Sequence, residues 1–235
     1  MIKVEEGFLW VASFDIGYRN LCFSIEEYNI DEISHLQKID KNKQYNDDGT
    51  ATEKQSEILT SICKNSRTVI FKNTDLTKES IKVLNPEVFH LLTDLLDEYQ
   101  EYWDKCGLFV IEKQMSFKGV YNVSALKLGQ HCWSYFAFKY GRFKQILDFP
   151  AYHKTQIFGA PKTVTTTKAG KIKYKSMDKL KRKKWVVTKA LEIFSDRNDT
   201  ESSSQLQISK KKDDISDCIL QSISAVYLIF VEKSI

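Results

Sequence analysis

The chain has 235 residues, of which 42% are hydrophobic, and this is enough to bury a sizeable core. Its five cysteines are dispersed without a C-x-x-C pair, which argues against a disulfide framework or a zinc knuckle, and no apolar run approaches the ~20 residues of a membrane span. The N-terminus has the pattern of neither a signal peptide nor a transit peptide. We therefore expect a reduced, intracellular protein without a membrane partner.

The start of the chain has the alternating character of β-strands. Residues 8–15 are β-rich, Gly17 allows a turn, and strand-like runs follow at 21–28 and 32–39, separated by a short polar turn. This pattern predicts a three-strand antiparallel meander.

The rest of the chain is predicted to alternate helices and strands. Asn85-Pro86 begins the clearest helix, because apolar residues recur behind it at helical spacing and proline is tolerated in a first turn. The other expected elements are an exposed polar loop at 41–55, a short helix at 54–64, a short strand at 67–72, a buried strand at 108–112, a helix at about 121–140, a strand at 143–149, a basic loop, a helix at about 178–194, a mobile link at 195–205 and a final helix at about 213–230.

This order of elements predicts the fold class. Strands that alternate with helices after an initial meander are typical of an α/β layer architecture. We expect a mixed sheet, a three-strand antiparallel meander plus parallel strands, flanked by helices. The expected organisation is one domain over 1–235 with polar insertions near 41–55 and 163–177.

Acidic residues stand at the ends of several predicted elements. Asp15 and Glu112 each close a strand, whereas Asp214 and Asp217 lie one helical turn apart at the start of the last helix; Asp213 can substitute for Asp214. Such carboxylates can hold two Mg²⁺ ions. Many nucleases hydrolyse phosphodiesters with two metal ions ~3.5–4 Å apart. Each acid alone is explained as readily by a turn, a helix cap or a solvated strand end. Their joint placement favours a metal site.

Three motifs carry a resemblance to a known family. Asp-Ile-Gly-x-Arg-Asn at 15–20, Ile-Glu-Lys-Gln at 111–114 and Lys-Lys-Asp-Asp-x-x-Asp at 211–217 resemble the poxvirus-type Holliday junction resolvases. These enzymes belong with bacterial RuvC and the fungal mitochondrial resolvases in the ribonuclease H-like superfamily. The resemblance extends in order from about residue 8 to residue 232.

The resemblance implies a fold, a reaction and a set of metal ligands. The fold is ribonuclease H-like, and the reaction is symmetric nicking of two opposed strands of a four-way DNA junction by a homodimer with Mg²⁺ or Mn²⁺. Asp15, Glu112, Asp214 and Asp217 match the family's metal ligands. Because no mitochondrial presequence is visible, the viral branch is favoured, with action at a cytoplasmic viral replication site.

A strongly basic segment lies between the second and third motifs. Residues 162–189 contain eleven Lys or Arg and one acid, a net charge of +10 that leaves −6 on the rest of the chain. This asymmetry predicts a polyanionic partner, although a solvated lysine-rich loop explains the block as well if it is considered alone. The candidate DNA-binding residues are Arg19, Asn20, Lys118, Lys175, Lys179, Lys181, Arg182 and Lys183.

One lysine of this segment is predicted to act in catalysis. Lys184 lies on the apolar stripe formed by Leu180, Val187, Leu191 and Phe194, and an inward-facing lysine needs an acid or a phosphate beside it. We expect Lys184, or its neighbour, to stabilise charge at the scissile phosphate. A lysine stem packed on the core with its ammonium in water is an equal alternative.

The predicted function is a metal-dependent structure-specific endonuclease that resolves four-way DNA junctions, without a small-molecule cofactor. Two alternatives stay open. One is a nuclease of the same fold that acts on flaps or RNA–DNA hybrids, and the other is a non-catalytic protein that binds branched DNA.

Overall fold

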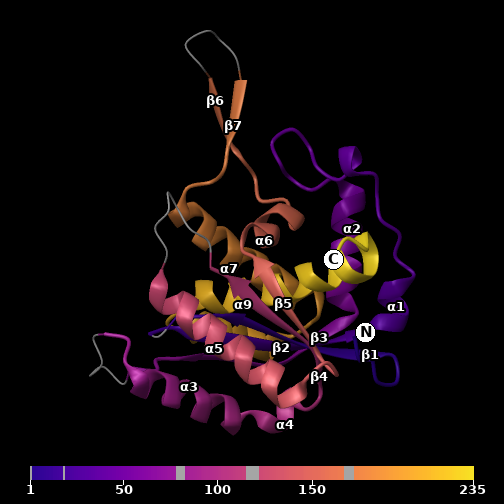
Figure 1. Ribbon diagram of the computed structural model, residues 1–235. Coiled ribbons are helices and arrows are strands. Elements are labelled where there is room, and N and C mark those ends of the chain that lie inside the picture. Colours follow the sequence, from indigo (N-terminus) through magenta and orange to yellow (C-terminus); the bar gives the residue numbers. More distant parts are fainter. Residues whose placement is uncertain (1, 18, 78–82, 115–121, 167–171) are drawn as a thin grey trace.

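The computed structural model describes residues 2–17, 19–77, 83–114, 122–166 and 172–235 (Figure 1). Its centre is a five-stranded sheet in the order β3-β2-β1-β4-β5. The strands are β1 (Phe8–Asp15), β2 (Leu21–Asn29), β3 (Ser66–Thr74), β4 (Cys106–Lys113) and β5 (Gln145–Pro150). β1, β2 and β3 pair antiparallel, whereas β4 and β5 continue the sheet parallel to β1. The predicted mixed sheet of a meander plus parallel strands is confirmed.

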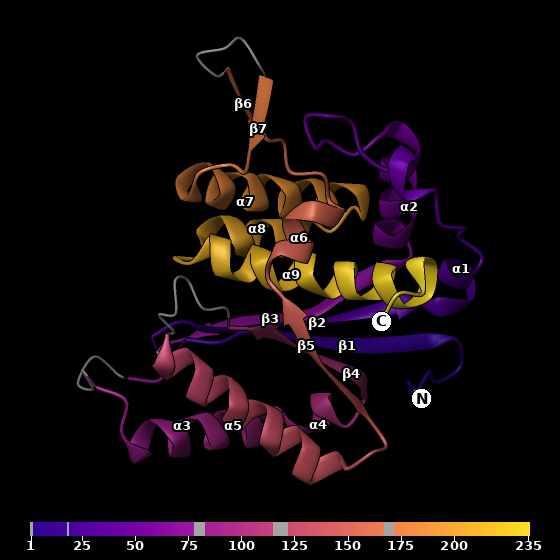
Figure 2. The same ribbon diagram turned by 45° about the horizontal axis from the view of Figure 1, so that its top comes forward.

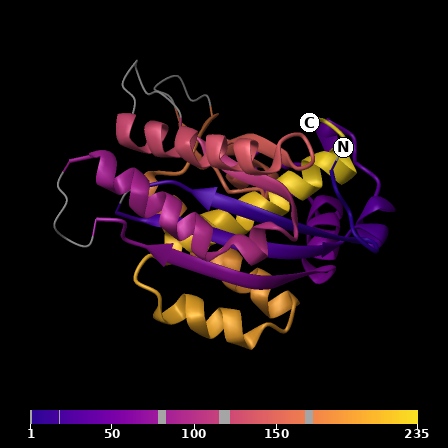
Figure 3. The same cartoon turned by 60° about the horizontal axis from the view of Figure 1, so that its bottom comes forward.

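Helices cover both faces of this sheet (Figure 2). One face carries α3 (Pro86–Glu98), α4 (Gln100–Trp103) and α5 (Val123–Tyr140), and α3 and α5 lie side by side across it (Figure 3). The other face carries α1 (Ile30–Ser34), α2 (Glu53–Lys64), α6 (Tyr152–Ile157), α7 (Lys179–Asp196), α8 (Thr200–Ile208) and α9 (Lys212–Val226). Two hydrophobic clusters fill the spaces between the sheet and the two helical layers.

The third strand of the meander is not the one predicted. The run at 32–39 is not a strand, because the Asn29 side chain accepts a hydrogen bond from the Glu32 N–H and starts the short helix α1. The spacing of Ile30 and Ile33 then buries both side chains against the sheet. The third strand is β3, whose centre was expected only as a short strand.

The predicted mobile link at 195–205 is also wrong. Asp199 caps α8 by accepting a hydrogen bond from the Ser202 N–H, and Leu206 of this helix is fully buried. Immediately before α8, the Arg197 guanidinium forms an ion pair with Glu26 of β2 at 2.6 Å, and both side chains are almost completely inaccessible. The segment is therefore part of the packed core layer.

α9 is the central helix of its layer. With the π-helical turn at Tyr227–Glu232 it is long and apolar enough by composition to cross a membrane, which the sequence pattern did not indicate. However, 78% of its apolar window is buried inside the protein, against β1, β2 and neighbouring helices. Burial in the core therefore explains its apolar composition.

The two polar stretches have more structure than predicted. The stretch 41–55 was expected to be an exposed loop, but Gln44 is buried and donates hydrogen bonds to Glu232 and Tyr227. The stretch 163–177 contains a two-stranded hairpin of β6 (Thr163–Thr166) and β7 (Ile172–Lys175), which projects from the body of the molecule (Figure 1). All five cysteines are free and buried, as the absence of a disulfide framework predicted.

Candidate active site and DNA-binding surface

Strand register places the first two acids side by side. In the parallel pair of β1 and β4, Phe14 is the partner of Ile111, so Asp15 and Glu112 are the next residues at the carboxyl ends of both strands. Side chains alternate along a strand, and Leu9 and Val11 of β1, like Leu108 and Val110 of β4, belong to the cluster beneath α9. Asp15 and Glu112 therefore face the same helical layer.

Helix α9 brings the third element to this edge. Asp217 lies one turn before Gln221, whose side-chain amide donates to the Ser13 hydroxyl at 3.0 Å and to the Phe14 and Val110 carbonyls at 3.1 and 3.2 Å. These buried contacts attach the helix to both strands immediately behind the two acids. As a result, Asp15 of β1, Glu112 of β4 and Asp217 of α9 lie at one edge of the sheet, and this edge with its acids is called the rim.

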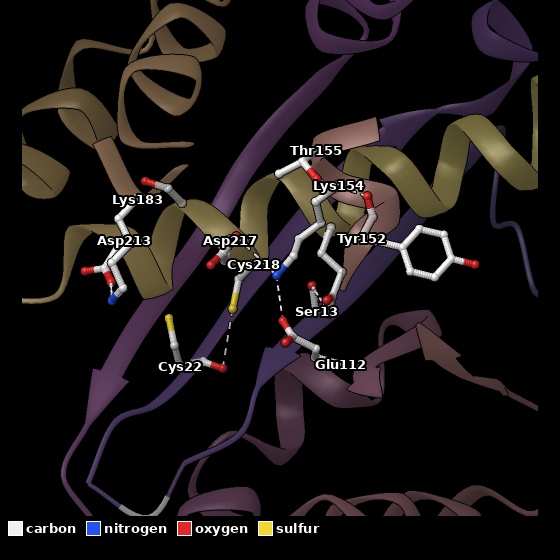
Figure 4. Close-up of polar contacts among 12 residues, drawn as sticks. Ser13, Cys22, Glu112, Tyr152, Lys154, Thr155, Lys183, Asp213, Asp217 and Cys218 are labelled. Atoms are coloured by element: carbon white, nitrogen blue, oxygen red, sulfur yellow. Dashed lines mark hydrogen bonds and ion pairs between the residues drawn. The ribbon is translucent and has the colours of Figure 1, made fainter. Parts of the chain in front are cut away.

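A buried lysine lies among these carboxylates. Lys154 of α6 is 4% exposed, donates to the Glu112 carboxylate at 2.6 Å and forms an ion pair with Asp217 at 3.1 Å (Figure 4). Burial opposes its charge, but Asp217, Glu112 and Asp15 together raise its pKa. No sequence motif indicated this residue. The available signal was its position directly after β5, because the carboxyl ends of parallel strands meet at one edge of a sheet.

The acids repel one another. Burial raises the pKa of Asp15 well above its usual range, and the neighbouring charges of Glu112, Asp217 and Asp214 raise it further, whereas Lys154 opposes the shift. Burial and the charge of Asp213 raise the pKa of Asp214 to about 6. One buried ammonium therefore does not balance the negative charge of this rim.

Asp213 and Asp214 are in different environments. Burial favours the neutral form of Asp213, but the hydrogen bond and the charge of Lys183 from α7 outweigh it and lower the pKa of Asp213. Asp214 interacts with Asp15 electrostatically. Asp213 is thus paired with a lysine, whereas Asp214 adds to the charge around Asp15.

The donor chemistry of this rim suits a divalent cation. Carboxylate oxygens are the ligands that Mg²⁺ prefers, and a bound cation would stabilise the ionised forms of Asp15 and Asp214, whose pKa values burial and neighbouring acids raise. In their present rotamers, no three acidic, histidine or cysteine side chains of the described segments are grouped closely enough to hold one ion. The acids fit a metal by their chemistry, and ligation would require other rotamers.

The predicted stripe of α7 is wrong, and with it the inward orientation of Lys184. The helix buries Val186, Ala190, Ile193 and Phe194, whereas Leu180 is 75% exposed. Its buried face is rotated from the predicted one, which leaves Lys184 exposed. Of the two candidate lysines, Lys183 is the one that contacts an acid of the site.

The predicted DNA-binding residues follow β1, end β7 or begin α7, and one lies outside the described part of the chain. Arg19 and Asn20 follow β1 beside Asp15, and Lys118 falls in the segment 115–121, which lies outside the described residues. Lys175 is exposed at the end of β7, and the remaining candidates, Lys179, Lys181, Arg182 and Lys183, are in the first turns of α7.

A pocket of about 520 Å³ connects the acids to the basic segment. Its lining includes Glu112, Lys154 and Asp217 together with Lys162 and Arg182. Cationic side chains beside carboxylates allow the pocket to receive an anionic group.

Comparison with known proteins shows a viral family. No protein-family model matches the chain. The chain is 36% identical over 245 residues to the uncharacterized protein 170L of Invertebrate iridescent virus 6, an alignment that covers 98% of this chain and 94% of that protein. The chain belongs to the family of this iridescent-virus protein.

Solved structures show the fold of this 170L-family protein. The fowlpox virus resolvase, determined in a complex with substrate Holliday junction DNA, matches with a TM-score of 0.51 and 14% identity over 94% of this chain and 99% of that chain. The yeast mitochondrial Holliday junction resolvase Ydc2 matches with a TM-score of 0.54 and 12% identity over 99% of this chain and 83% of that chain. The predicted ribonuclease H-like fold and the resemblance to the resolvases are therefore confirmed at the level of fold.

Proposed function

We propose that this protein is a metal-dependent endonuclease that resolves four-way DNA junctions by paired symmetric nicks. The observation that carries the proposal is the meeting of Asp15, Glu112 and Asp217, from two strands and a helix, around the buried ammonium of Lys154. A purely structural role does not require acids from two strands and a helix beside a pocket that Lys162 and Arg182 also line, nor the raised pKa values of Asp15 and Asp214.

The proposed cofactor is Mg²⁺, two ions, with Mn²⁺ as a substitute. Asp15, Glu112, Asp214 and Asp217 would hold the ions, which activate water and relieve charge on the phosphate when bound. Asp214 is a better candidate than Asp213, because Lys183 already neutralises Asp213. Lys154 holds Glu112 and Asp217 in place and supplies a cation against the negative charge of a bound phosphate.

The proposed substrate is branched DNA. The pocket joins the acids to the basic segment, and lysines and arginines bind backbone phosphates without reading sequence. The fowlpox virus protein of similar fold is described as a resolvase with Holliday junction DNA, which supports the junction as the preferred form of DNA. The viral relative favours action during viral DNA recombination or replication inside the infected cell.

We also propose a homodimer, because two opposed strands must be cut. Helix α5 exposes an apolar stripe formed by Val123, Leu126 and Trp133, which are 54%, 44% and 38% exposed. Gly129 lies on the same stripe, and a Cβ built there would have no neighbour within 4 Å. A mid-helix glycine is unfavourable for an isolated helix by about 1 kcal/mol, so close approach of a second helix is a physical reason for it.

The test is cleavage of a labelled synthetic four-way junction in Mg²⁺, with linear duplex, flap and RNA–DNA hybrid as controls. Paired symmetric nicks confined to the junction are expected for the wild type. Asp15→Asn should abolish them, whereas Asp94→Asn, a change at an exposed acid of α3, should not. A preference for flaps or hybrids would show that the proposed substrate is wrong. Tight junction binding without cleavage in Mg²⁺ or Mn²⁺ would show that the proposed enzymatic activity is wrong.

A further inference from the structure

The β6–β7 hairpin has two chemically different faces. In its register, Thr163 pairs with Lys175 and Thr165 with Lys173, so both lysines and both threonines lie on one face. The other face carries Val164, Ile172 and Tyr174, which are 55%, 57% and 42% exposed. Neither face packs on the body of the protein, because the hairpin projects away from it (Figures 1 and 2).

The root of the hairpin is part of the candidate active-site pocket. Lys162, directly before β6, and Ser176 and Met177, directly after β7, line the same pocket as Glu112 and Asp217. The hairpin therefore begins and ends at the lining of this pocket, so a long ligand that leaves the pocket past Lys162 or Ser176 meets the hairpin.

The first polar stretch contacts the chain just before the hairpin. The Lys162 N–H donates to the Asp48 carbonyl at 2.6 Å, and the Lys162 side chain lies against Gly49, where a Cβ would come within 3.0 Å of Cε. Gly159, with φ of +68°, lies so close to the first polar stretch that a Cβ on it would be 2.2 Å from the Ala51 nitrogen. Residues of the first polar stretch therefore contact the segment that leads into the hairpin, more than 100 residues away in the sequence.

The hairpin is incomplete as an isolated element. A two-stranded hairpin with no packed face is marginally stable in water, and this one also exposes three large apolar side chains. Its described residues contain no acid, and Lys162, Lys179 and Arg182 add positive charge around its root. Charge complementarity points to a polyanion as the occupant.

We propose that the β6–β7 hairpin binds the backbone of a duplex DNA arm whose strand lies in the active-site pocket. This inference rests on the proposed function and deepens it, because it assigns the element that holds the arm. Lys173 and Lys175, which share one face of the hairpin, contact the phosphates of this arm. Four residues per strand at ~3.3 Å span about 13 Å, which matches roughly four base pairs at 3.4 Å each.

The experiment measures junction binding in EDTA as a function of salt, so that binding is separated from cleavage. The variant Lys173→Ala/Lys175→Ala removes two cations from an exposed face and leaves the core unchanged. The expected result is a slope of log K against log salt that is less steep by about 2, and an affinity about tenfold weaker at moderate salt. The matched control Lys38→Ala/Lys64→Ala, which removes two exposed lysines from another surface, should keep the wild-type slope.

Backbone charge in the arms provides the second measurement. A junction whose arms carry neutral methylphosphonate linkages beyond the crossover should bind wild type and the hairpin variant equally, because the hairpin then has no phosphate charge to contact. If the wild type cuts junctions and the hairpin variant keeps the wild-type salt slope, the inference is wrong but the proposed function stands. A variant that loses its dimeric state while the slope is unchanged would assign the hairpin to a second copy and would also overturn it. Failure of the wild type to bind or cut junctions would overturn both.

Discussion

Lys154 shows how a single buried charge organises the candidate site. An ammonium that is 4% exposed loses most of its hydration. It stays charged because it donates a hydrogen bond to Glu112 and forms an ion pair with Asp217. The same contacts hold the two carboxylates near each other, because the shared cation offsets their repulsion. In a metal-free protein, Lys154 therefore supplies the counter-charge of the rim.

Replacing Lys154 with methionine tests this role. Because the change leaves two carboxylates without their cation, we expect the metal-free protein to lose about 3 kcal/mol of unfolding free energy. Junction cleavage should fall at least 100-fold, since a cation at the scissile phosphate is lost. Urea unfolding with and without Mg²⁺, together with cleavage kinetics, measures both effects.

Lys183→Met is the matched control, because the Lys183 side chain is 42% exposed and pairs with Asp213 at the edge of the site. Its effect on stability should be smaller, about 1 kcal/mol or less. If Lys154→Met cuts junctions at the wild-type rate, the role of Lys154 in the reaction is wrong.

The raised pKa of Asp214 predicts how the stability of the metal-free protein depends on pH. Its pKa in the folded protein is about 6, above the unfolded value of about 3.9, so folding favours the protonated form. The ionised carboxylate therefore destabilises the metal-free fold progressively as the pH rises from about 4 through 6. Asp214→Asn cannot ionise and should be more stable above pH 7, by on the order of 1–2 kcal/mol, with no advantage below pH 4.

Urea unfolding in EDTA between pH 4 and pH 8 measures this difference. The control Asp94→Asn, at an exposed acid without close charged partners in the described structure, should show no such trend. A stability gain of Asp214→Asn that is the same at every pH would show that charge repulsion is not its cause.

At the scale of elements, the turn between α7 and α8 is attached to the sheet by a buried ion pair. Arg197 donates to Glu26 at 2.6 Å, to the Cys63 carbonyl at 3.1 Å and to the hydroxyls of Thr68 and Ser66. Burial raises the pKa of Glu26, although Arg197 opposes the shift. The guanidinium thus connects α7 and α8 to β2 and β3.

Removing one member of this pair should be costly. Arg197→Met leaves the Glu26 carboxylate buried without its cation, so we expect a loss of about 3–5 kcal/mol of unfolding free energy. The double variant Arg197→Met/Glu26→Gln should recover part of this loss, because the unpaired charge is removed as well. Chemical denaturation of the two variants and the wild type measures the difference, and equal stability of the single and double variants would contradict the explanation.

Local signals predicted the elements whose burial follows from their own sequence. The helix behind Asn85-Pro86 is present as α3, with Asn85 as its cap, and the strand that ends at Glu112 is present as β4. The prediction failed at α1 and α8, where Asn29 and Asp199 act as caps within short polar stretches. Short helices depend on tertiary packing for most of their stability, so their sequences carry weak signals.

At the scale of the whole molecule, the proposed homodimer depends on the exposed stripe of α5. Leu126→Glu/Trp133→Glu puts two charges on this stripe, at side chains that are 44% and 38% exposed. The variant should be monomeric at concentrations where the wild type is a dimer, since burial of these charges in an interface is unfavourable. It should also release single nicks instead of paired ones from a junction.

Light scattering measures the oligomeric state, and a cruciform plasmid distinguishes single from paired nicks. Ile208→Glu, a charge at an 84% exposed residue of α8 on the other face of the sheet, is the control and should stay dimeric. A monomeric wild type, or a dimeric α5 variant, would contradict the proposed interface.

The sequence by itself determined the mixed sheet, the position of Asp15 and Glu112 at strand ends and the placement of Asp214 and Asp217 one turn apart. Each of these follows from local periodicity or spacing, which backbone geometry enforces wherever the element lies. Tertiary structure alone decided that Lys154 lies between Glu112 and Asp217, and that α7 turns Lys184 outward. The physical reason is that burial and charge pairing are set by neighbours distant in sequence, and these contacts leave no periodic pattern in the chain.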